Sequence, residues 1–176
     1  MTRVELESKL NNDFAWMLET WSAISPEDRT RNLKASAADP EFFWNAQDHL
    51  VHLAGIEAVF NNIARRTVAG EPNPIQLFDS KPDGTRPSKE EIMLRVHQMN
   101  DDWIRKNRGK SFDEAVALSR KVRAETLALV AELTEEQLGQ KIPGAPWADG
   151  TIGGVIGVNG DHARQHHGWI TRDLAN

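Results

Sequence analysis

The chain has 176 residues, and its 21 basic and 26 acidic residues give a formal net charge of −5. It contains no cysteine, which excludes a disulfide scaffold, a cysteine nucleophile, a thiolate zinc site and an iron–sulfur cluster. Because a mildly acidic chain lacks the clustered basic surface typical of nucleic-acid-binding proteins, we expect no nucleic-acid partner. The length suits one domain, which we expect to span residues 1–176.

No feature of the chain marks a membrane or secreted protein. The N-terminal segment lacks the apolar run of a signal peptide, and the longest weakly polar stretch, residues 152–158, is too short to cross a bilayer. We therefore expect a cytoplasmic protein with no membrane partner. Any chemistry falls to the six histidines, the carboxylates and the hydroxyls, with or without a metal.

The first two predicted elements are helices with apolar stripes. The spacing of apolar residues predicts one helix over about residues 3–25, ended by Pro26, and a second over about residues 45–69, ended by Gly70 and Pro72. The two stripes consist of Leu10, Phe14, Met17, Trp21 and Ile24, and of Leu50, Leu53, Phe60 and Ile63.

A proline-rich stretch, residues 71–88, predicts a long surface loop between the second and third helices. Two sequences with the form of a capping box follow it, and they predict helices over about residues 88–107 and 111–133. The cap residues of these boxes are Ser88 with Glu91 and Ser111 with Glu114.

A short helical segment is expected at residues 134–138, followed by a last helix over about residues 151–174. The glycines Gly153, Gly157 and Gly160 share one face of this last helix and would allow a close approach to a neighbouring helix. No strand pattern occurs. We therefore predict an all-α fold, a four-helix bundle with a long connection between helices 2 and 3 and one extra helical segment.

The histidines are the candidate functional residues. His162 and His166 are four residues apart, so both imidazoles lie on one helical face, where they can bind one metal ion. If the second helix packs against the last, His52 supplies a third nitrogen, which leaves an open site for Zn, Ni, Fe or a similar divalent ion. The alternative is that these histidines are surface groups or hydrogen-bonded core residues.

The neighbours of these histidines also receive predicted roles. Asp48 lies one turn before His52 and is expected to orient it by accepting a hydrogen bond. We interpret His49 as a flanking polar group, and we expect His167 to point away from the site. His97 is expected on an exposed or half-buried helix face.

Two runs of sequence resemble one known family. Residues 44–57 look like the "W…D-x-L-x-H-L" second helix of the DinB-like superfamily, and residues 160–170 are similar to its terminal H-x-x-x-H helix. The superfamily includes the metal-binding domain of mycothiol-dependent maleylpyruvate isomerases. The resemblance implies a four-helix bundle with a divalent metal ion on His52, His162 and His166.

The resemblance also implies a reaction class, because family members of known activity mainly use mycothiol, bacillithiol or glutathione-like thiols. We therefore expect a thiol-dependent S-transferase or isomerase that acts on a small molecule. Since the chain has no cysteine, the thiol must come from a small cofactor. Two alternatives stay open: a metal-dependent hydrolase with Glu57 or Asp161 as base, and a non-catalytic small-molecule-binding or stress-response protein.

The sequence also suggests contacts around such a site. The loop Pro72–Ser88 would cover its open side. Arg123 and Arg164 are candidates for an anionic group, and the alternative, which we favour for both, is a solvated helix face. Three tryptophans are candidate pocket walls, with the helix core as the alternative: Trp44, Trp147 and Trp169. The apolar helix faces also allow a homodimer.

Overall fold

The computed structural model describes residues 1–76 and 84–175, and this part of the chain is helical, without strands. The all-α prediction is confirmed. The long helices are α1 (Arg3–Ala23), α3 (Ala46–Val68), α4 (Lys89–Asn107), α5 (Phe112–Glu132) and α8 (Asn159–Leu174). The short helices are α2 (Pro26–Thr30), α6 (Glu135–Gly139) and α7 (Ile152–Gly157).

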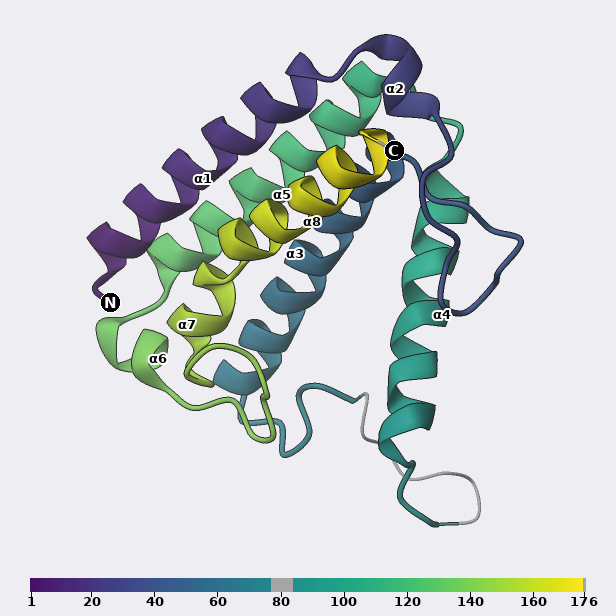
Figure 1. The fold of residues 1–176 in the computed structure, drawn as a ribbon. Helices are drawn as coiled ribbons and strands as arrows, with labels where there is room; N and C mark the ends of the chain where they lie inside the picture. Colours follow the sequence, from purple (N-terminus) through teal and green to yellow (C-terminus); the bar gives the residue numbers. More distant parts are fainter. Residues whose placement is uncertain (77–83, 176) are drawn as a thin grey trace.

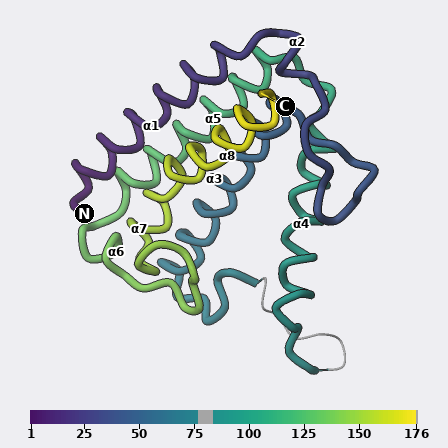
Figure 2. The backbone as a smooth tube through the Cα atoms, in the orientation of Figure 1, coloured from purple at the N-terminus to yellow at the C-terminus, as the bar shows by residue number. Residues whose placement is uncertain are grey.

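Four long helices, α1, α3, α5 and α8, lie side by side, and α4 stands outside them (Figure 1). Within this group α3 contacts both α5 and α8, and α1 contacts the same two helices. The tube view shows α4 to one side of the four other long helices (Figure 2), and from there it contacts α3. The fourth member of the bundle is therefore α8, which brings the C-terminal histidines next to α3.

Local sequence signals explain where the helices begin. Both predicted capping boxes form: the Ser88 hydroxyl accepts from the Glu91 N–H at 3.2 Å, and Ser111 and Glu114 pair in the same way. Asn45 opens α3, with its side chain accepting from the Asp48 N–H at 2.8 Å. The start of α3 is fixed by this cap, and with it the height of His52 along the helix.

A buried tryptophan joins α1 to the start of α3. Trp21 has no exposed surface, and its indole Nε1–H donates to the Ala46 carbonyl at 2.8 Å. Leu50 and Ile170, also fully buried, belong to the same apolar cluster. Burial of each such side chain contributes about 1.5–3 kcal/mol, so this cluster holds α1, α3 and α8 in register.

The last predicted helix is divided in the structure. A continuous helix was expected over residues 151–174, but α7 ends and α8 begins around Val158. Glycines weaken the helix there, and the predicted close approach is present: a Cβ added to Gly160 would lie 1.9 Å from an Asp13 carboxylate oxygen on α1. The glycines therefore interrupt the helix and allow it to pack closely against α1.

The segment after α1 also differs from the prediction. Pro26 was expected only to end the first helix, and it does so, but it also occupies the first turn of α2, with Ser25 as the N-cap. Within the described residues, no helix has both the length and the apolar character needed to cross a bilayer.

Candidate metal centre

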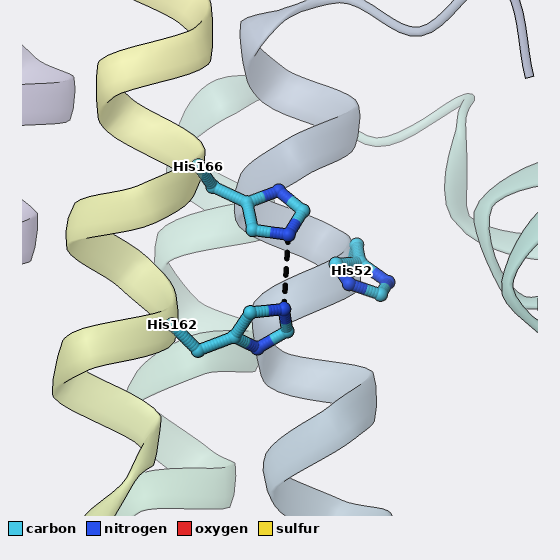
Figure 3. Close-up of side chains that lie close together, drawn as sticks. All are labelled: His52, His162 and His166. Carbon is cyan, nitrogen blue, oxygen red and sulfur yellow. Dashed lines mark hydrogen bonds between the residues drawn. The ribbon is translucent and has the colours of Figure 1, made fainter.

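Three histidines from two helices converge at one point of the bundle. His52 comes from the middle of α3, and His162 and His166 come from consecutive turns of α8 (Figure 3). One ring nitrogen from each residue lies within 4.8 Å of the other two, and the Nε2 atoms of His162 and His166 are 2.9 Å apart. The structure therefore brings together the three residues that the sequence selected.

The chemistry of these donors suits a divalent ion. Tetrahedral zinc with bonds of about 2.0–2.1 Å separates its ligand nitrogens by about 3.3 Å. The His162 and His166 nitrogens are 2.9 Å apart, and no pair in the triad exceeds 4.8 Å. Burial lowers the pKa of His162 to about 4 and also lowers the pKa of His52 and His166, where the neighbouring imidazoles add to the effect. The three rings are neutral at pH 7, so their lone pairs are available, and together they could hold a metal ion.

A fourth histidine, His49, contacts the cluster, although we predicted only a flanking polar group at this position. His49 is buried, and its Nδ1 lies 2.6 Å from Nδ1 of His166. If Nε2 of His166 binds a metal ion, its Nδ1 must carry the proton and donate it to His49. The sequence feature that could have indicated this role is the spacing of three residues between His49 and His52, which places both on the inner side of α3.

We expect the His49→Phe variant to bind divalent metal about 10–100-fold more weakly, because Nδ1–H of His166 loses its acceptor. In His49→Asn, the side-chain oxygen can replace the imidazole Nδ1 and keep the affinity within about threefold of the parent protein. Competition with a metallochromic chelator measures both variants. Equal affinities for Phe, Asn and His at position 49 would contradict this role.

Asp48 does not have its predicted role. Its carboxylate accepts from the Asn45 N–H at 3.0 Å as part of the capping box and forms an ion pair with Arg108 at the end of α4. Both carboxylate oxygens are therefore occupied by donors other than His52, namely the Asn45 N–H and the Arg108 guanidinium. The spacing of four residues was compatible with either role, and the cap takes precedence because it satisfies a free backbone N–H.

The histidine cluster opens on a cavity of about 290 Å³. Trp44 and Trp169 contribute to its wall as expected, with ring centroids 5.1 Å from His52 and 4.6 Å from His166 respectively. Trp147 does not, because it packs on Phe60 in the core at 5.1 Å. The remaining lining residues are Lys34, Ala35, Ser36, Ala37, His49, His97, Asn100 and His162.

A segment other than the described part of the predicted lid lines this cavity, and we call this segment the cover. Residues 77–83 of the loop Pro72–Ser88 lie outside the described residues, and its described ends do not line the cavity. Residues 34–37, between α2 and α3, lie there instead. Ser36 and Trp44 both donate to the buried Asp101 of α4, at 2.6 and 3.0 Å, so one carboxylate ties the cover to the cavity wall.

The other histidines follow the predictions in part. His167 points away from the cluster and makes ring contacts with Trp16 and Trp21 at 5.4 and 5.5 Å. His97 is half-buried on α4, as expected, but it also lines the cavity opposite α3. No local pattern predicts this position, because it depends on how α4 packs on the bundle.

The candidate bases and anion-binding residues lie elsewhere. Glu57 and Arg123 are both buried and form an ion pair with each other, while Asp161 is exposed and 3.6 Å from Lys9. Arg164 pairs with Asp13 at 2.7 Å. None of these four residues lines the histidine cavity, so the described part of the chain assigns them structural or surface roles.

Fold and site together define a helical bundle with a histidine cluster able to hold a metal ion. The family model of the DinB superfamily matches residues 17–170, so the chain belongs to this superfamily. No curated protein matches the sequence.

Two solved structures share the fold. An uncharacterised protein from Escherichia coli UTI89 is 19% identical with a TM-score of 0.66, and the match covers 99% of this chain and 94% of that one. The colibactin self-resistance protein ClbS, in complex with double-stranded DNA, is 14% identical with a TM-score of 0.64, and the match covers 98% and 95% of the two chains.

The comparison with ClbS corrects one prediction. We expected no nucleic-acid partner because the chain is acidic, yet a protein of this fold is seen in complex with double-stranded DNA. Net charge summed over the whole chain does not describe any single face of the molecule. The overall acidity was therefore insufficient ground for excluding nucleic acid.

Proposed function

We propose that the protein is a metal-dependent enzyme in which His52, His162 and His166 hold a divalent ion and a low-molecular-weight thiol attacks a small-molecule substrate. The observation that carries the proposal is the set of three neutral imidazole nitrogens within 4.8 Å of one another, beside a cavity. An ion held by neutral ligands keeps its full charge and lowers the pKa of a thiol brought next to it.

The chain's own residues supply the positioning in this proposal. His49 keeps the proton of His166 on Nδ1, so that Nε2 stays free as a ligand atom. Trp44 and Trp169 flank the cluster and give the cavity aromatic walls. The cover at residues 34–37 carries Lys34, the cationic side chain of the cavity wall, which suits the carboxylate of a thiol cofactor. We place this chemistry in the cytoplasm, where thiols remain reduced.

The experiment is thiol binding to protein loaded separately with Zn, Ni or Fe. We expect saturable binding of mycothiol, bacillithiol or glutathione by calorimetry, and thiol consumption with an electrophile such as chlorodinitrobenzene. The metal-free protein and the His52→Ala variant should show neither. Metal-loaded protein that binds none of the three thiols contradicts the proposal.

The same metal-loaded protein, assayed without added thiol, tests the two alternatives. Hydrolysis of esters or amides without added thiol would favour a metal-dependent hydrolase, although neither Glu57 nor Asp161 lies at the cavity to act as its base. Tight small-molecule binding without turnover would favour a non-catalytic protein. A protein of the same fold is described as a self-resistance protein, which is compatible with a stress-response role with or without turnover.

A further inference from the structure

A second cavity, of about 420 Å³, lies between α3 and α4. We call it the α3–α4 groove. It meets the histidine cavity at His52 and Asn100, which line both. The groove therefore begins at a candidate metal ligand and continues along α3 away from the cluster. Its other lining residues are Gly55, Ile56, Ala58, Val59, Asn62, Met99, Asp102, Trp103 and Lys106.

The walls of this groove are predominantly apolar. Ile56 and Val59 lie on α3, one and two turns beyond His52, and Met99 faces them from α4. The charged side chains, Asp102 and Lys106, are exposed and opposite in sign, so the groove carries no net charge to attract an ion.

The largest residue of the groove wall, Trp103, has its indole N–H bonded to the backbone and therefore not available to a ligand. Trp103 donates its indole N–H to the Val51 carbonyl at 2.8 Å. Its ring lies directly over Gly55, where an added Cβ would be 2.6 Å from the indole nitrogen. Because the only polar atom of the ring is already bonded, the rest of the indole offers carbon to the groove. Glycine at position 55 is what lets the ring lie this close to α3.

We propose that the α3–α4 groove binds the aliphatic or aromatic arm of a small-molecule substrate whose reactive polar group lies at the histidine cluster. This inference rests on the proposed function, since the cluster fixes the polar end of the substrate. The two adjoining cavities, about 290 and 420 Å³, have the size and mixed polarity of small-molecule sites. A wholly polar substrate would leave the apolar walls in water.

A second copy of the chain fits the groove less well than a small molecule does. The exposed large apolar side chains of α4, Met93 and Leu94, do not line the groove but lie nearer the N-terminal end of the helix. An interface between copies would cover these exposed residues first. The continuity with the histidine cavity points to a ligand that extends from one cavity into the other.

The test uses a series of unbranched alkyl hydroxamic acids, from acetohydroxamic to decanohydroxamic acid, on zinc-loaded protein. The hydroxamate binds zinc and is the same in every member, so only the apolar arm changes. Calorimetry should show saturable binding of the shortest member and an affinity that rises about fourfold with each added methylene until the groove is filled.

Two variants test whether the rise in affinity with alkyl chain length comes from the groove. Ala58→Trp fills it with a large side chain, and Met99→Gln replaces a wall residue by a polar one of similar length, which keeps the test valid if the first variant folds poorly. In both variants, the hydroxamate affinity should rise less with alkyl chain length, and the affinity for acetohydroxamate should stay unchanged. Ala117→Trp, the same substitution at an exposed position of α5, is the matched control and should keep the full gain.

The outcomes separate the two proposals. If no hydroxamate binds, the metal site itself fails, and this inference fails with it. If all hydroxamates bind equally, or if both groove variants keep the gain with chain length, the groove assignment alone is overturned. A dimer that dissociates in Ala58→Trp would assign the groove to a second copy of the chain and also overturn it.

Discussion

Replacing His166 by alanine is expected to abolish divalent metal binding, whereas replacing His167 by alanine leaves it intact. His166 is the centre of the cluster: its Nε2 is 2.9 Å from His162 and its Nδ1 is 2.6 Å from His49. A site reduced to two imidazoles loses the third neutral donor that an open zinc site requires. We expect about one ion per chain in the parent protein and below about 0.1 in the variant, measured by elemental analysis after gel filtration.

His167 is a matched control because it is the same residue type, adjacent in the chain and on the same helix. Its ring packs on Trp16 and Trp21 and belongs to no cluster of candidate ligands among the described residues. His52→Ala should behave like His166→Ala, although it lies on the other helix. Circular dichroism would show whether each variant keeps its helices. Unchanged metal content in folded His166→Ala and His52→Ala would rule out the triad.

The sequence was sufficient for the three candidate ligands because their geometry is mostly local. The spacing of His162 and His166 follows from helical periodicity, and only the pairing of α3 with α8 had to be supplied by the fold. The supporting residues could not be found in this way. His97 lines the cavity from α4, and Asp101 of α4 accepts hydrogen bonds from Ser36 and Trp44 of its wall. The position of α4 depends on packing against α3 rather than on any local pattern.

The fold shows the same division between local and non-local information. Capping boxes and apolar stripes predicted α1, α3, α4 and α5 to within a few residues, because each signal acts over one or two turns. The break at Val158 was not predicted: the glycines around it weaken the helix, and Gly160 also lies against Asp13 of α1, a residue far from it in sequence. The role of Arg123 was missed for a similar reason: its partner Glu57 is 66 residues away.

Replacing Arg123 by methionine is expected to destabilise the fold by about 3–5 kcal/mol, which is the usual cost of leaving a buried charge without its partner. The Arg123 side chain joins three helices: Nη2 donates to Glu57 of α3 at 2.9 Å, and Nη1 donates to the Leu10 carbonyl of α1 at 2.6 Å. Its Nε also lies 2.8 Å from the other Glu57 oxygen, off the line of a good hydrogen bond. Without Arg123, the Glu57 carboxylate keeps, among the residues that the structure describes, only the Thr126 hydroxyl as a donor.

A loss of this size lowers the Tm of a protein of this length by roughly 6–20 °C in a thermal melt. The double variant Glu57→Leu and Arg123→Met should recover much of the loss, because both charges leave the interior together. Arg120→Met, at an exposed position one turn earlier on α5, is the matched control and should change stability by less than about 0.5 kcal/mol. Metal affinity of the folded Arg123→Met protein should equal that of the parent, since Arg123 does not line the histidine cavity. If Arg123→Met melted like Arg120→Met but bound metal or thiol poorly, the pair would belong to the functional site rather than to the scaffold.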